Sequence, residues 1–293
     1  MTFAIRRLIS AGFVLSILAV PVLGQPAAET PPHRAEPAKE AAREPAKLPP
    51  EQTTHHVLEL PGRTLKFAAT AGAIRLSDDD NEPVADVAYI AYQLDGADRR
   101  SRPVTFVFNG GPGMASGWLQ AGAVGPWRIP IGGANGVPSG APDPQPNADT
   151  WLDFTDLVFV DPPGTGYSRI VAKADAARRR LWSVNGDIDA LAETIRRWLD
   201  RSDRIVSPKY ILGESYGGFR GPRLARRLQE HEGVGVSGLV LLSPLLDTHD
   251  ESGFADALSW VDLLPTEVAV PTPASTRLAW RAMRTAPSAD TTG

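Results

Sequence analysis

The sequence predicts an α/β fold with a mainly parallel central sheet. Through the middle of the chain, short apolar runs alternate with helix-like segments, which is the pattern of parallel strands joined by helices. The runs predicted as strands are residues 104–108, 157–160, 209–212 and 239–242. Residues 157–160 are apolar at every position, as expected for a strand that is covered on both faces. The runs 104–108 and 209–212 each end in a glycine-rich turn.

The segments around these strands complete the prediction. Residues 57–60, 65–67 and 86–92 are strand-like runs between Gly, Asp and Asn turns, so antiparallel hairpins are expected before the parallel part. A helix is expected from about Asp187, because its apolar residues are spaced to face a core. These residues are Ile188, Leu191, Ile195, Trp198 and Leu199.

Several segments are predicted to be solvated or irregular. The helix from Tyr216 to about Glu232 should be kinked or interrupted at Pro222. The arginine run 178–180 is expected in a solvated loop, and the Gly- and Pro-rich segment 132–147 in a long surface loop. His55 and His56 have no third ligand nearby in the sequence, so we expect solvated side chains there rather than a metal site.

The N-terminal region predicts export. Arg6 and Arg7 precede an apolar stretch, 8–23, and residues 22–24 suit cleavage by a signal peptidase. We expect 1–24 to be a cleaved signal peptide. Its removal would leave the protein in the periplasm or outside the cell, with no membrane attachment. The alternative is an uncleaved membrane anchor. The remaining divisions are a Pro/Ala-rich disordered linker at 25–52, the α/β core at 53–250 and the start of a helical cap at 251–293.

Composition narrows the range of functions. The chain has 293 residues with 42% hydrophobic content, which suits one large domain. A net charge of −4 and a pI near 5.8 argue against a nucleic-acid partner, which would favour a basic patch. Cysteine is absent, so disulfides, thiolate nucleophiles and lipidation at a cysteine are excluded.

The sequence GESYG at residues 213–217 has the form of a nucleophile elbow. In a Gly-x-Ser-x-Gly elbow the chain leaves a strand, turns sharply around the serine and enters a helix, so glycines must flank the turn. The apolar pair Ile211 and Leu212 precedes it and a helical segment follows. This pattern predicts Ser215 as a nucleophile that forms an ester with its substrate.

A second turn, NGGPG at residues 109–113, follows the apolar run 104–108. In the α/β-hydrolase fold, which carries such elbows, a loop of this kind supplies one backbone N–H of the oxyanion hole, and the residue after the serine supplies the other. Glycine lets the amide approach a reacting carbonyl with no side chain in the way. The two turns together predict acyl-transfer chemistry more strongly than either does alone.

With DPPGTGYS at residues 161–168, these turns make the chain resemble the serine carboxypeptidase family in the form found in bacteria. The resemblance covers motifs from 104 to 220, and flanking strands fit from about 54 to 247. It implies an α/β-hydrolase fold and a hydrolase that removes C-terminal residues from peptides, with no cofactor and no metal. Prolyl aminopeptidases share a GGPG loop but carry His before the glycines and Trp after the nucleophile, so they resemble the chain less.

The resemblance also implies residue roles. Ser215 would be the nucleophile, and the N–H groups of Gly111 and Tyr216 would form the oxyanion hole. Asn109 and Glu214 match two members of the family's network for the substrate's C-terminal carboxylate.

The third member of that network, a glutamate in the family, corresponds here to Ala123. With only one carboxyl group left, the family's preference for acidic pH is not expected to carry over unchanged. Arg128 either pairs with the substrate carboxylate instead or is an ordinary surface arginine.

The triad histidine and aspartate are the larger departure. After Ser215 the chain contains His231, four helical turns away, and His249, which precedes the place of the family histidine. We therefore expect a C-terminally incomplete family member in which 239–242 is an uncovered edge strand. Three alternatives follow: part of an active exported carboxypeptidase, a non-catalytic remnant that keeps a peptide-binding cleft, or an esterase or acyltransferase on the same fold.

Overall fold

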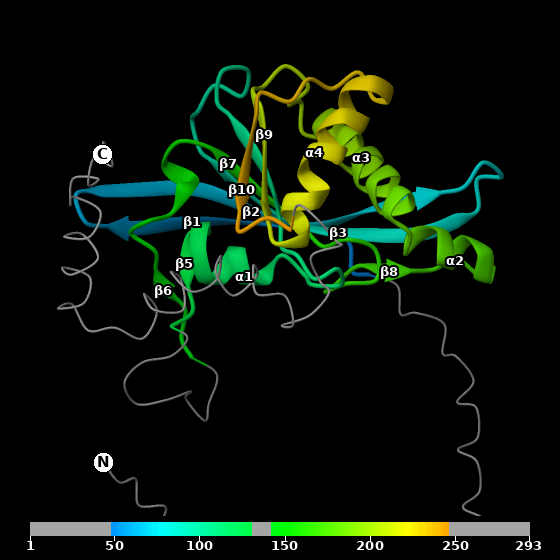
Figure 1. Cartoon of the computed structure of the whole chain (residues 1–293). Helices are drawn as coiled ribbons and strands as arrows, with labels where there is room; N and C mark the ends of the chain where they lie inside the picture. Colours follow the sequence, from blue (N-terminus) through cyan, green and yellow to red (C-terminus); the bar gives the residue numbers. More distant parts are fainter. Residues whose placement is uncertain (1–47, 131–141, 246–293) are drawn as a thin grey trace, which may run out of the picture. The chain divides into compact units, whose positions relative to one another are not determined.

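The computed structural model describes residues 48–130 and 142–245, which form a mixed sheet with helices on both faces (Figure 1). Within these residues the strand order is β1-β2-β3-β7-β4-β9-β10, and the short strand β8 pairs with β3. The bounds are β1 Gln52–Leu60, β2 Arg63–Ser77, β3 Pro83–Leu94, β4 Val104–Phe108, β7 Asp156–Val160, β8 Arg169–Ile170, β9 Lys209–Glu214 and β10 Gly238–Leu242.

The sheet combines the two predicted parts. Strands β1, β2 and β3 are antiparallel and join β7 in antiparallel register, whereas β7, β4, β9 and β10 run parallel. This is the expected α/β-hydrolase arrangement of opening hairpins followed by a parallel core. The N-terminal strands are longer than the sequence runs suggested, because alternating partly polar positions continue them beyond their apolar centres.

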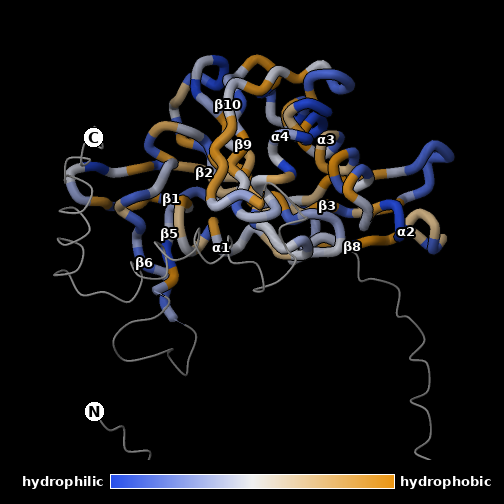
Figure 2. The backbone as a smooth tube through the Cα atoms, in the orientation of Figure 1, coloured by the Kyte–Doolittle hydropathy of each residue, from blue (hydrophilic) through white to orange (hydrophobic). Residues whose placement is uncertain are grey.

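Helices cover the two faces with separate apolar clusters. Successive residues of a strand point to opposite faces, so Phe106 packs with α3 Val184–Arg201 and α4 Tyr216–His231, and Val107 packs with Leu119 on the other face. Figure 2 shows this concentration of hydrophobic residues in the strands, most clearly in β9 and β10. The remaining elements are α1 Gly117–Leu119, the π-helical turn Gln120–Val124, β5 Trp127–Arg128, β6 Gln145–Pro146, the 3-10 turn Trp151–Asp153 and α2 Asp175–Leu181.

Two helix predictions need correction. The arginine run lies in α2, not in a loop, although its side chains are exposed as expected. Helix α3 begins at Val184 rather than Asp187, because the Ser183 hydroxyl accepts a hydrogen bond from the Gly186 N–H and caps the helix.

Helix α4 continues through Pro222 as a single helix, so the predicted interruption is wrong, whereas the alternative of a kink stays a prediction. Proline lacks an N–H and therefore removes one backbone hydrogen bond in the second turn of the helix, but the helix continues beyond it.

His56 is only partly solvated, in contrast to the prediction of a solvated side chain. Its ring stacks on Phe67 with centroids 5.5 Å apart and lies edge-on to Trp127 at 5.0 Å. The Thr54 hydroxyl lies 2.7 Å from its Nε2 atom. His55, one residue earlier on β1, points to the other side and is exposed as expected.

Several predictions fall outside the described residues: the signal peptide, nearly all of the linker and the start of the cap. The segment 132–147 is described only from residue 142, and there β6 pairs with β5 instead of forming a loop. Between residues 48 and 245, apart from 131–141, no helix is long and apolar enough to cross a membrane.

Strand β10 is the last strand of the sheet in the part of the chain that the structure describes. Its residues Leu239, Val240, Leu241 and Leu242 are between 38% and 46% exposed, which matches the prediction of an apolar edge.

Candidate active site

Ser215 occupies a sharp turn between β9 and α4. Its backbone angles are φ 55° and ψ −118°, a conformation that non-glycine residues rarely adopt. A side chain at Gly213 would collide with the Gly217 carbonyl, and one at Gly217 would lie 2.7 Å from the Phe108 carbonyl oxygen. The two glycines therefore allow the chain to pass through the turn, and the strand–turn–helix form predicted from GESYG is present.

Backbone hydrogen bonds hold this turn in place. The Ser215 N–H donates to the Leu242 carbonyl at 3.0 Å, which connects the turn to the end of β10. The Ser215 carbonyl accepts from Gly218 N at 2.8 Å and from Leu245 N at 2.9 Å. A conformation that costs energy in isolation persists because these contacts over-determine it.

The glycine loop after β4 lies directly against the serine. Strands β4 and β9 are parallel neighbours, with Phe108 opposite Gly213, so both loops leave the same edge of the sheet. A Cβ atom at Gly110 would lie 2.6 Å from Ser215 Cβ and 2.8 Å from Tyr216 N. Gly111 is exposed and has φ 106°, which favours glycine. The backbone amides of this loop and of α4 are thus presented beside a partly exposed serine.

Asn109 and Glu214 connect the two loops. The buried Asn109 amide donates from Nδ2 to Glu214 Oε2 at 3.2 Å, and the Gly110 N–H donates to the same oxygen at 3.2 Å. Asn109 Oδ1 accepts from Leu119 N at 3.0 Å, so it also fixes α1. The structure brings together all five residues predicted for the site: Asn109, Gly111, Glu214, Ser215 and Tyr216.

A buried ion pair that the sequence analysis missed lies beneath this site. Arg220 on α4 donates from Nε to Asp187 Oδ2 on α3 at 2.7 Å and from a terminal nitrogen to the Asn109 carbonyl at 3.2 Å. Its guanidinium lies 5.0 Å from the Tyr216 ring centroid. Burial raises the pKa of Asp187, while the charge of Arg220 acts in the opposite direction. A charged residue on the core-facing side of α4 was the available sequence signal.

Asp161, in the loop after β7, fixes the glycine loop from its other side. Its Oδ1 atom accepts from Ser116 N at 2.9 Å and its Oδ2 atom from Tyr167 N at 3.0 Å. A side chain at Gly166, where φ is 49°, would collide with this carboxylate. The glycine at 166 thus permits the loop to fold over Asp161, and Asp161 holds the start of α1.

A cavity of about 560 Å³ adjoins the Asn109–Glu214 pair. Its lining residues come mostly from the glycine loop, α1 and β5, and they are Asn109, Met114, Trp118, Leu119, Gly122, Ala123, Arg128, Ile129, Pro130 and Glu214. The wall is largely apolar, with one guanidinium, one carboxyl group and one amide. Such a cavity can hold a side chain while a few polar groups fix its orientation.

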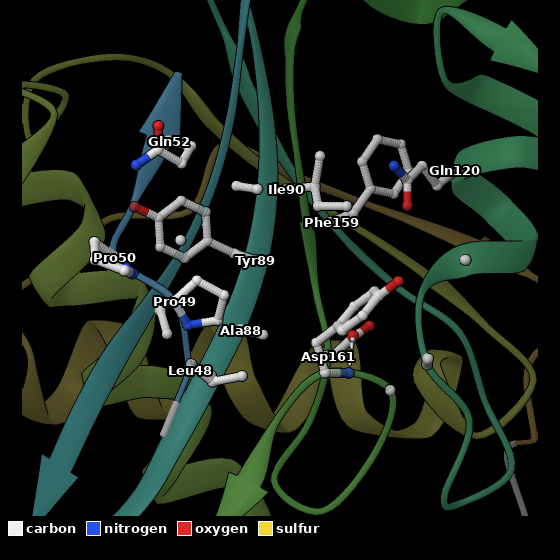
Figure 3. Close-up of a pocket in the computed structure, with 17 residues that line it drawn as sticks. Leu48, Pro49, Pro50, Gln52, Ala88, Tyr89, Ile90, Gln120, Phe159 and Asp161 are labelled. Carbon is white, nitrogen blue, oxygen red and sulfur yellow. Dashed lines mark hydrogen bonds between the residues drawn. The ribbon is translucent and has the colours of Figure 1, made fainter. Parts of the chain in front are cut away.

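A second cavity, of about 400 Å³, lies over β2 and β3 (Figure 3). Leu48, Pro49 and Pro50 form one side and Phe159 and Asp161 the other. The Tyr89 hydroxyl on its floor donates to Glu51, and burial together with this bond raises the pKa of Tyr89. The lining of this cavity is mainly apolar, and its carboxylate, Asp161, is already hydrogen-bonded to two backbone N–H groups.

The described histidines lie away from Ser215. His55 and His56 are on β1, which is five strands from β9, or roughly 24 Å at the usual strand spacing. His231 is the last residue of α4, roughly 24 Å from the serine along the helix axis. His249 lies outside the described residues. Among residues 48–130 and 142–245, no group of His, Asp and Glu side chains could hold a metal ion.

Comparisons with known proteins agree with this geometry. The pheromone-processing carboxypeptidase KEX1 of Yarrowia lipolytica is 32% identical over 148 residues, which are 50% of this chain and 22% of that protein. Serine carboxypeptidase-like 29 of Arabidopsis thaliana is 25% identical over 67% of this chain and 40% of its own length. The chain thus spans less than half the length of these curated relatives.

A solved structure confirms the fold class. The prohormone-processing carboxypeptidase KEX1(ΔP) from Saccharomyces cerevisiae superposes with a TM-score of 0.53 at 18% identity, covering 74% of this chain and 46% of that one. The sequence profile of serine carboxypeptidases matches residues 61–260, which include the glycine loop, the Asp161 loop and the elbow at Ser215. By this match the chain belongs to the serine carboxypeptidase family.

Proposed function

We propose that the protein is an exported serine-type carboxypeptidase that removes C-terminal residues from peptides through an ester on Ser215. The observation that carries this proposal is the contact of the Ser215 elbow with the glycine loop, together with the Asn109–Glu214 hydrogen bond beside it. The contact of the elbow with the glycine loop suits attack of the serine on a carbonyl. The Asn109–Glu214 pair lies beside it, where we place the C-terminal end of a bound peptide.

In this proposal the Ser215 hydroxyl oxygen attacks the carbonyl carbon of the last peptide bond. The N–H groups of Gly111 and Tyr216 stabilise the resulting oxyanion, and each such donor contributes about 3 kcal/mol to transition-state stabilisation. The bond to the C-terminal residue then breaks, and that residue leaves with a free amino group. Water hydrolyses the ester and regenerates Ser215.

The serine needs a base that accepts its proton and an acid that orients the base. The described histidines on β1 and at the end of α4 are too far from Ser215 for this role. We assign the base and its acidic partner to residues outside 48–130 and 142–245. His249 is a weak candidate, because Asp247 precedes it by two positions and could hardly orient it.

Labelling with a fluorophosphonate probe tests the nucleophile. The probe should modify Ser215, as identified by peptide mass spectrometry, and Ser215→Ala should abolish the labelling. Ser243→Ala is a matched control, because this serine also has a positive φ, of 42°, but lies after β10 rather than in the elbow. An unlabelled, folded protein would contradict activity of this chain and favour a peptide-binding cleft.

A second assay separates the reaction classes. A carboxypeptidase releases the last residue from a peptide with a free C-terminus but not from its C-terminal amide. Equal cleavage of both, or hydrolysis of simple esters alone, would contradict the carboxypeptidase proposal and favour an esterase on the same fold.

Export is a separate part of the proposal and rests on residues 1–24. Expressed with its N-terminal region in a Gram-negative host, the protein should be recovered from the periplasm or the medium with Gln25 as its first residue. Intact mass measurement decides this, and a protein that retains residues 1–24 would contradict cleavage.

A further inference from the structure

Arg128 occupies an unusual position in the cavity beside Asn109 and Glu214. It lies on β5, is partly buried and lines that cavity together with both residues. One terminal nitrogen donates to the Ala123 carbonyl at 3.3 Å. Ala123 is itself a lining residue, so the guanidinium is held against the cavity wall.

The donors of Arg128 are only partly used. Its Nε atom is buried and has no hydrogen-bond partner within the described residues. Its second terminal nitrogen lies 3.5 Å from Asp149 Oδ2, but the Asp149 side chain is 78% exposed, so this ion pair is long and screened by water. A buried donor without a partner is costly, and a carboxylate is the ligand that matches the planar fork of an arginine.

The charges around the cavity point to the same ligand. Glu214 is the acidic residue of the lining and, when ionised, would repel a carboxylate. Arg128 is the lining residue that carries a positive charge. Since Ala123 adds no acidic group, an incoming anion meets one positive and one negative side chain together with the Asn109 amide.

We propose that Arg128 determines specificity by binding the C-terminal carboxylate of the substrate, an inference that rests on the proposed function. Met114, Trp118 and Ile129 form the apolar wall of the same cavity and receive the side chain of the terminal residue. The preferred substrates are therefore peptides with a free carboxylate on an apolar C-terminal residue.

Binding to the Ser215→Ala protein tests this inference without turnover. An N-acetylated dipeptide ending in leucine is titrated calorimetrically alongside its C-terminal amide. The free carboxylate should bind about 10- to 100-fold more tightly than the amide, the range typical of hydrogen bonds to charged groups. When Arg128→Met is added to the Ser215→Ala protein, the carboxylate and the amide should bind with about equal affinity. The affinity for the amide should stay the same.

Two further variants make the result specific. Arg128→Lys keeps the charge but not the fork, and it should retain part of the preference. Arg226→Met is the matched control, because Arg226 is exposed on α4 and pairs only with Glu230 in the described residues. It should leave both affinities unchanged.

The possible outcomes are distinguishable. A preference that survives Arg128→Met overturns the inference and assigns recognition to Asn109 and Glu214, with the proposed function intact. Equal loss of affinity for carboxylate and amide also overturns it, because that result indicates a structural role. Absence of any preference in the Ser215→Ala protein counts against the carboxypeptidase function itself.

Discussion

The Asn109 side-chain amide donates to the Glu214 carboxylate at 3.2 Å and thereby links the loop after β4 to the end of β9. The same carboxylate oxygen accepts the Gly110 N–H, and the Asn109 carbonyl oxygen accepts the Leu119 N–H. These three bonds, in which the acceptor for Leu119 is the side-chain oxygen Oδ1 of Asn109, position the glycine loop, the elbow and α1 relative to one another. Changes to this pair should therefore alter both stability and reactivity.

Asn109→Asp should destabilise the fold and slow fluorophosphonate labelling. The substitution replaces a donor with a second carboxylate next to Glu214, at a buried position. Leaving such a group without its partner costs about 1–3 kcal/mol in unfolding free energy. Urea denaturation measures this cost. Adding Glu214→Gln should recover most of it, because the new amide can donate to the new carboxylate, and failure to recover would contradict the pairing.

Gly110→Ala should disrupt the contact between the two loops. The added methyl group would lie 2.6 Å from Ser215 Cβ, and neither loop can move freely. We expect a loss of about 1–3 kcal/mol in unfolding free energy, as in other overpacked sites, and a lower labelling rate. Gly117→Ala is the control, because an added Cβ there meets nothing within 4 Å. Equal effects of the two substitutions would contradict the proposed packing.

Arg220→Met should destabilise the protein strongly, by about 3–5 kcal/mol, because it leaves the Asp187 carboxylate buried without a counter-charge. Thermal or urea unfolding measures this loss. Adding Asp187→Asn removes the stranded charge and should restore part of the stability. Arg226→Met, at an exposed pair, should cost less than about 0.5 kcal/mol.

The free energy of unfolding of the Arg220→Met variant should also depend on pH differently from that of the parent. Burial raises the pKa of Asp187, and removal of Arg220 takes away the charge that opposes this rise. A carboxyl group whose folded pKa is raised stabilises the fold below its unfolded pKa, near 3.8, and this contribution is lost as pH rises through the folded value. The variant's free energy of unfolding should therefore fall, relative to that of the parent, as pH rises above about 3.8. If the free energies of unfolding of the variant and the parent change with pH in parallel, this expectation is contradicted.

Tyr89→Phe should make the protein less sensitive to alkaline pH. Burial and the Glu51 carboxylate raise the pKa of Tyr89 above the ordinary value of 10.0. The contribution of this phenol to stability is complete below pH 10 and is lost as pH rises towards the folded value. Urea unfolding at pH 8 and pH 11 should show a smaller drop for Tyr89→Phe than for the parent. Glu51→Gln should give an intermediate drop, because burial remains.

The sequence was most informative where structure is set by local chemistry. The apolar run 157–160 and the flanking glycines of Ser215 specify a covered strand and a sharp turn almost by themselves. The neighbourhood of Asn109 and Glu214 could be predicted as well, because parallel strands end at one edge of a sheet. The roles of these residues stay predictions until they are tested by substitution.

The missed features depend on contacts between distant segments. Arg220 and Asp187 are 33 positions apart, and only the packing of α3 on α4 joins them. The partly buried His56 packs against Trp127, which is 71 positions later in the chain. The hydrogen bond from Arg128 to Ala123 forms across the turn between α1 and β5, and the periodicity of the sequence does not predict the conformation of this turn.

The carboxylate of Asp161 has a consequence for how a ligand would be received. By accepting N–H groups from Ser116 and Tyr167, it fixes two loops before any ligand arrives. The conformational entropy of ordering this edge is thus lost when the chain folds rather than when a peptide binds. A peptide would therefore bind to a preformed edge, and we expect little change in the backbone conformation of these two loops on binding.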